Sequence, residues 1–115
     1  HNLNYSYDED YDPMEKDNDS IFMDEYVTYC QNNLSVFFPK IKDAQIADAI
    51  LSIFEQREFL DIFNKKALYI YIREMVEVKT PQITKIADRL GDIYKEHYLF
   101  YKENGHTNFK EDLYL

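Results

Sequence analysis

An apolar stripe in the second half of the chain constrains the fold more than any other feature of the sequence. Its members recur at steps of three and four residues: Ile83, Ile86, Ala87, Leu90, Tyr94 and Tyr98. This spacing puts them on one face of an α-helix, which other elements must cover. Thr80 can cap the start of that helix, and Pro81 suits the first helical position because no backbone donor is needed there. The sequence therefore predicts a helix from Pro81 to about Glu103, with Gly91 inside it either to admit another helix closely or to mark a bend.

The segment before this helix has helical spacing as well. Asn64 can cap a helix of residues 65–77. Its apolar face holds Leu68, Tyr71, Ile72 and Met75. A short turn at residues 78–80 then joins the two helices into a helix-turn-helix-like hairpin over about residues 65–103. Lys65 and Lys66 lie at the start of the first of these helices, where cations are mildly unfavourable, so they are either solvated lysines or contacts for a partner.

Two further helices are predicted upstream. The first covers about residues 21–33 and begins after Ser20. Its stripe consists of Phe22, Tyr26, Tyr29 and Cys30. The second covers about residues 44–62 after a cap at Asp43, and a change in the phase of its stripe allows a break near Glu58. That stripe consists of Ala47, Ile50, Leu51, Phe54, Phe59, Ile62 and Phe63.

These elements predict an all-α fold. Only two glycines and three prolines are present, which argues against a turn-dense, sheet-rich architecture. We expect a compact four-helix domain over residues 20–105, an acidic tyrosine-rich tail over residues 1–19 and a short amphipathic tail over residues 106–115. The apolar connector at residues 34–39 is predicted to pack on the core. Asn104-Gly105 is predicted to end the last helix, and a hairpin turn that would form a wing is the alternative.

Acidic residues are concentrated at the amino end. The formal net charge is −9, and residues 1–25 hold nine acids against Lys16, a balance of −8, while the other 90 residues hold 13 acids and 12 bases, a balance of −1. A globally acidic protein has little general affinity for DNA, because phosphate neutralisation supplies most nonspecific binding. The tail is predicted either to be solvated or to dock on a basic partner through its acids and tyrosines. The residues assigned to that interaction are Tyr5, Tyr7, Asp8, Glu9, Asp10, Tyr11 and Asp12.

The sequence carries no catalytic motif. It lacks a glycine-rich phosphate loop, a nucleophile elbow and paired histidines at metal-ligand spacing. Cys30 is the sole cysteine, so neither an internal disulfide nor a cysteine-based zinc cluster can form, and we expect it to be a half-buried thiol. His97 and His106 are expected at the surface or rim. We therefore predict a protein that is not an enzyme and has no cofactor, metal or small-molecule substrate. No apolar run approaches the roughly 20 residues that span a bilayer, so no membrane partner is expected, and the predicted location is the host-cell cytoplasm or a virion.

The polar face of the last helix indicates a class of partner. Five polar residues lie largely off the apolar stripe or just before it: Lys79, Gln82, Thr84, Lys85 and Arg89. Recognition helices present such side chains to bases and phosphates, and residues 65–110 hold nine bases and six acids, a local balance of +3. The segment 78–90 resembles the second half of helix-turn-helix domains and of sigma-factor region 4, although its turn is about one residue longer and Val76 or Glu77 stands where a glycine is expected. The alternative is an ordinary helical hairpin with a solvated polar face.

The carboxyl end shows a second resemblance. Asp112-Leu113-Tyr114-Leu115 is similar to the acid-then-hydrophobic tails with which phage late-transcription coactivators grip a sliding clamp, and the alternative is that Leu113 and Leu115 fold back onto the body. The composition is also similar to that of small helical phage accessory proteins. These resemblances imply a non-enzymatic accessory protein of a nucleic-acid machine, in transcription or genome handling, with a protein partner and possible direct nucleic-acid contact. Two other functions remain open, a structural or assembly component and an acidic inhibitor that mimics nucleic acid.

Overall fold

Helices form most of the chain that the structure describes. The structure is a computed structural model that describes residues 13–60 and 64–109, with side chains from Asp19 onward. Its elements are α1 (Pro13–Asn32), α2 (Leu34–Phe37), α3 (Ile41–Glu55), a 3₁₀ turn η2 (Arg57–Phe59), α4 (Lys65–Met75) and α5 (Thr80–Asn104). No strand occurs within these two described ranges, which confirms the all-α prediction.

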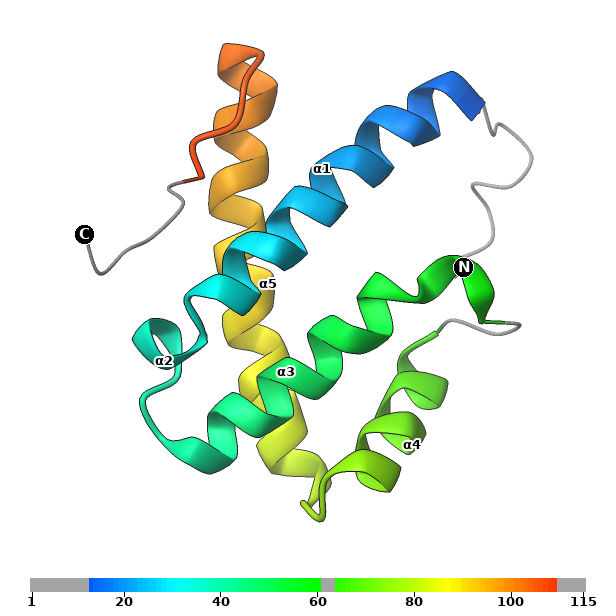
Figure 1. The fold of residues 1–115 in the computed structure, drawn as a ribbon, viewed down its shortest axis with the longest axis vertical. Coiled ribbons are helices and arrows are strands. Elements are labelled where there is room, and N and C mark those ends of the chain that lie inside the picture. The colour runs from blue at the N-terminus through cyan, green and yellow to red at the C-terminus, as the bar shows by residue number, and fades with distance from the viewer. Residues whose placement is uncertain (1–12, 61–63, 110–115) are drawn as a thin grey trace.

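Helix α3 is the centre of the packing. It contacts α1, α2, α4 and α5, and Figure 1 shows α1 and α3 crossing in front of α5 while α4 lies beside α3. The buried residues of α3 therefore occupy most of its circumference: Ile46, Ala47, Ala49, Ile50, Leu51 and Ile53. The predicted stripe of α5 is confirmed as its counterpart, because Ile83, Ile86 and Leu90 are all buried. Contacts between aliphatic side chains of α3, α4 and α5 thus form the lower half of the core.

Aromatic side chains fill the other half of the core, between α1 and α5. Phe22 is 1% exposed, and its ring centroid lies 5.1 to 5.5 Å from those of four other rings. These rings belong to Tyr94, Tyr98, Tyr101 and Phe109. Tyr26 is buried as well, and its hydroxyl donates a 2.7 Å hydrogen bond to the Leu90 carbonyl of α5. Among the described tyrosines, Tyr26 and Tyr29 are buried, and Tyr94, Tyr98 and Tyr101 are half-buried against this core, so a ring can be covered while its hydroxyl still finds a partner.

Arg57 links the carboxyl end of α3 to α1. Its guanidinium donates to the Phe54 carbonyl at 2.7 Å and to Ser20 Oγ at 2.9 Å, and it pairs with Asp24 Oδ1 at 3.0 Å. The predicted helix of residues 44–62 is wrong in its end, because α3 stops at Glu55 and only the short η2 follows, but this end lies close to the break that the change of phase allowed near Glu58. A guanidinium that satisfies a carbonyl near the end of α3 favours this early stop.

The same end of α3 reverses another expectation. Phe59 was predicted to lie on a buried stripe, but it is 85% exposed because helical phase is lost after Glu55. Ile62 and Phe63 of that predicted stripe lie outside the described residues. Residues 34–39 behave as predicted, since Phe38 is buried, although part of the segment forms the short helix α2.

Helix α1 begins earlier than the sequence analysis predicts. It already starts at Pro13, so Ser20 lies inside the helix instead of capping it, and the expected boundary at residues 19 and 20 falls within α1. Pro13 suits the first turn of a helix, and no glycine or proline interrupts the chain between it and Asn32. These local features favour a helix despite the acids in this stretch.

The boundaries of α4 and α5 are close to those predicted. Lys79, not Thr80, is the capping residue of α5, and its backbone N–H donates to Gln82 Oε1 at 3.1 Å. Gly105, with φ 78°, ends α5 in a left-handed conformation, which confirms a helix end there. Met75 is 57% exposed despite its helical spacing, because it is the last residue of α4 and lies beyond the covered part of that helix.

Gly91 lies inside α5 without a packing reason for a glycine. No atom beyond the neighbouring residues and the surrounding turns of α5 lies within 4 Å of the position that a Cβ would take, so the alternative of a close approach by another helix is wrong. We predict that Gly91→Ala stabilises the protein by about 0.5–1 kcal/mol, because alanine loses less backbone entropy in a helix. The matched control is Gly105→Ala, which must place a Cβ at φ 78° and should destabilise. A thermal melt in which Gly91→Ala unfolds below the wild type would contradict this assignment.

Candidate functional site

The polar residues predicted on α5 do not form one surface. Thr84 Oγ1 lies 2.8 Å from the Tyr69 hydroxyl, so this side chain links α5 to α4 in a half-buried contact. The Gln82 carboxamide accepts the Lys79 N–H at the start of α5. Thr84 therefore helps to join α5 to α4 and Gln82 helps to cap α5, whether or not they also contact a partner.

Lys85 and Arg89 lie on a different side of α5. Lys85 Nζ is 3.9 Å from Asp43 Oδ2 at the start of α3. The guanidinium of Arg89 lies 5.7 Å from the centroid of the Phe37 ring on α2, at cation–π distance. Both side chains are exposed and belong to the corner that α2, α3 and α5 form, away from the contact between Thr84 and α4.

Three exposed cations, Lys65, Lys66 and Arg73, lie on the outer face of α4. A groove of about 570 Å³ is lined there by Lys65, Lys66, Tyr69, Ile70 and Arg73, and none of these five is acidic. Lys65 Nζ lies 5.9 Å from the Tyr69 ring centroid, and Ile70 is 47% exposed between the cations. We call these five residues the α4 groove.

The α4 groove was only partly visible in the sequence. The sequence analysis left open whether Lys65 and Lys66 are solvated or contact a partner, and it did not group Arg73 with them. Positions 66, 69, 70 and 73 are separated by three, one and three residues, and this spacing places the four side chains on one face of the helix. This spacing was the signal that could have found the groove.

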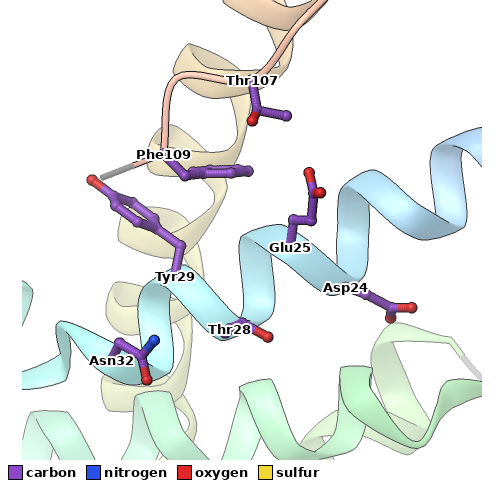
Figure 2. A pocket seen from close by; sticks show the side chains of 7 residues that line it. All are labelled: Asp24, Glu25, Thr28, Tyr29, Asn32, Thr107 and Phe109. Carbon is purple, nitrogen blue, oxygen red and sulfur yellow. The ribbon is translucent and has the colours of Figure 1, made fainter. Parts of the chain in front are cut away.

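A second groove lies between α1 and the segment that follows α5. It has a volume of about 460 Å³ and is lined by Asp24, Glu25, Thr28, Tyr29, Asn32, Thr107 and Phe109. Figure 2 shows Phe109 above Tyr29, with Glu25 reaching toward Thr107. Its charge is opposite to that of the α4 groove, but Asp24 is already paired with Arg57. Among the described residues, no three His, Cys, Asp or Glu side chains are grouped so that they could hold a metal ion.

The buried titratable groups are kept neutral by their burial in the core. Cys30 is fully buried, not half-buried as predicted, and burial raises the pKa of its thiol to about 12. Burial also raises the pKa of Tyr26 far above its usual value and that of Tyr94 to about 12. Each group is therefore neutral near pH 7. A thiol with so high a pKa is a poor nucleophile, so Cys30 serves as part of the core.

Of the remaining predicted site residues, only Lys79 lies within the described part of the chain. Lys79 is exposed at the start of α5, beside the turn from α4. The tail residues Tyr5, Tyr7, Asp8, Glu9, Asp10, Tyr11 and Asp12 lie outside the described residues, as do Asp112, Leu113, Tyr114 and Leu115. Their interactions stay predictions from the sequence.

Neither a membrane-spanning helix in the described part of the chain nor a known relative assigns a function to these surfaces. Across residues 13–60 and 64–109, none of the helices is both long enough and apolar enough to span a bilayer. Comparison of the chain with protein-family models, with curated proteins and with solved structures finds no significant match in any of the three.

Proposed function

We propose that this protein is a non-enzymatic accessory protein of a nucleic-acid machine and that it contacts nucleic acid through the α4 groove. The observation that carries the proposal is the lining of that groove, three cations around Tyr69 and Ile70 with no acid among them. The helix-turn-helix resemblance supports the same partner class but pointed to α5. The proposal moves the contact to the preceding helix of the hairpin.

Local charge makes such a contact feasible in an acidic protein. The net charge of −9 is concentrated in residues 1–25, which carry −8, whereas α4 carries Lys65, Lys66 and Arg73 against the single acid Glu74. The screening length at physiological ionic strength is about 8 Å, so charges beyond the next helix contribute little at the groove. The excess of bases on α4 therefore attracts phosphates to this helix, although the protein as a whole is acidic.

The apolar part of the groove favours a single strand over a duplex. Tyr69 is half-buried and held by its hydrogen bond to Thr84, and Ile70 is exposed beside it. Proteins that bind single strands combine cations along the backbone with rings or apolar side chains under the bases. A duplex would cover only the cations and leave Ile70 without a partner.

A pair of charge-neutralising variants tests the proposal. Lys66→Gln with Arg73→Gln should weaken binding of a single-stranded oligonucleotide by about one to two orders of magnitude at about 50 mM salt, and should flatten the salt dependence by about 0.7 in log–log slope for each lost contact. The matched control is Lys85→Gln with Arg89→Gln, which removes the same charge from the corner of α2, α3 and α5 and should bind normally. All four positions are exposed, so both variants should stay within about 0.5 kcal/mol of wild-type stability.

The opposite outcome restores the sequence prediction. If the Lys85 and Arg89 variant loses affinity while the α4 variant binds normally, α5 is the contacting helix. If wild type and both variants fail to bind at about 50 mM salt, direct nucleic-acid contact is excluded, because that is where electrostatic binding is strongest.

A second candidate function rests on exposed apolar side chains. Phe59 is 85% exposed and Ile41 is 78% exposed, and both positions could contact further copies in an assembly. Light scattering separates the two candidates. The accessory role predicts a monomer of 13.9 kDa, and a ring or larger oligomer would favour a structural or assembly component.

A further inference from the structure

The segment after α5 forms a strap that returns to the body of the protein. Gly105 turns the chain with φ 78°, and Figure 1 shows the segment running back beside the upper part of α5 toward α1. We call residues 105–109 the strap. At its end, the Phe109 ring centroid lies 4.8 Å from that of Tyr29, 4.8 Å from that of His97 and 5.5 Å from that of Phe22. Phe109 thus packs against a surface formed by the rings of Phe22 and Tyr29 on α1 and His97 on α5, which we call the aromatic floor.

His97 lies directly beneath this cover. Its ring centroid is 5.0 Å from that of Tyr29 and 4.8 Å from that of Phe109, so aromatic rings from α1 and from the strap both contact it. Its Nδ1 is buried and has no hydrogen-bond partner in residues 13–60 and 64–109. A neutral ring with its proton on Nε2 leaves only an unused lone pair at Nδ1. A protonated ring would place an N–H and a positive charge there, with no acceptor, which is the more costly arrangement.

We propose that the strap is a pH-sensitive clasp, in which protonation of His97 releases Phe109 and uncovers the aromatic floor on α1 and α5. Opening the strap gives Nδ1 access to water, and the charge is then solvated. The exposed rings of Tyr29 and Phe22 would form an apolar surface that is absent at neutral pH. This device is independent of the α4 groove and of the function proposed for it.

The surroundings of His97 shift its pKa in both directions. Burial lowers the pKa of His97 from its ordinary 6.5, and Glu96 on the same helix raises it, with burial the larger cause. From α1, Tyr29 and Cys30 have raised pKa values and stay neutral in acid. Glu25 and Asp24 line the adjoining groove, and the titratable group of the strap, His106, is exposed with its ring edge toward Phe100.

The direction of the pH dependence follows from these contacts. Because the pKa of His97 is lowered when the strap is closed, closure is stabilised above pH 6.5 and is progressively weakened as the pH falls through the lowered value. Attraction between an imidazolium and the face of Phe109 acts in the opposite direction. If that attraction were the larger effect, the strap would tighten in acid, so the sign of the response decides the proposal.

NMR of the full chain measures that sign. The ring signals of His97 and the backbone amides of residues 105–109 are followed from about pH 8 to about pH 5, where histidine titrates. We expect His97 to titrate with a midpoint below 6.5, and the strap amides to move toward flexible-chain shifts with the same midpoint. Phe109→Ala should raise the midpoint of His97 toward 6.5, since the two events are linked.

Two variants serve as controls. His97→Phe keeps a ring in the aromatic surroundings and should hold the strap closed at every pH, whereas His106→Gln removes the exposed histidine and should leave the transition unchanged. The proposal is wrong if His97 titrates at or above 6.5, if the strap amides do not follow it, or if Phe109→Ala leaves its midpoint unchanged.

Discussion

Phe22→Ala is expected to lower the free energy of unfolding by about 3–5 kcal/mol, the largest effect of any single substitution considered. The ring is 1% exposed and touches four other aromatic rings, three from α5 and one from the strap. Its removal leaves a cavity between α1 and α5 and also forfeits the ring–ring contacts. A small domain has only about 5–15 kcal/mol of stability, so the melting temperature should fall by more than about 10 °C.

Phe59→Ala is the matched control for this change. The same atoms are deleted from a side chain that is 85% exposed, so stability should stay within about 0.5 kcal/mol of the wild type. Equilibrium denaturation of both variants measures the difference directly. Equal losses from Phe22 and Phe59 would mean that the aromatic cluster between α1 and α5 does not exist in solution.

Ile86→Ala is expected to cost about 2–5 kcal/mol. Ile86 is 2% exposed and lies on the α5 stripe that faces the central helix α3. Ile41→Ala removes the same atoms from a residue that is 78% exposed at the start of α3, and it should be nearly neutral. A loss below about 0.5 kcal/mol for Ile86 would place it on the surface and reverse the face of α5 that packs inward.

The helical spacing of apolar residues was sufficient to predict most of the fold. The spacing of Ile83, Ile86 and Leu90 predicted which face of α5 is buried, because an amphipathic helix can satisfy its apolar stripe only by packing. Residues Phe22 and Tyr26 on α1 were placed in the same way. These predictions needed only local spacing, and the structure confirms them.

Helix ends set by distant residues could not be predicted in this way. The stop of α3 at Glu55 accompanies contacts from Arg57 to Ser20 and Asp24, which lie 37 and 33 residues away along the chain. The sequence shows Arg57 only as a solvated base among acids. Its partners become visible once α1 lies across α3.

The candidate site shows the same division. Gln82 and Thr84 were grouped with Lys85 and Arg89 because all four lie off the apolar stripe of α5. The structure divides them, since Thr84 meets Tyr69 of α4 while Arg89 lies over Phe37 of α2. A helical wheel cannot distinguish a polar residue that faces a neighbouring helix from one that faces solvent.

Chemical-shift mapping with an oligonucleotide tests the central claim most directly. A short single strand is added to the isotopically labelled full chain at about 50 mM salt, where phosphate contacts are strongest. The α4 groove predicts that amide shifts concentrate at residues 65–73 and disappear on raising the salt to about 200 mM. Shifts concentrated at residues 79–89, with α4 unchanged, would contradict it and return the contact to α5.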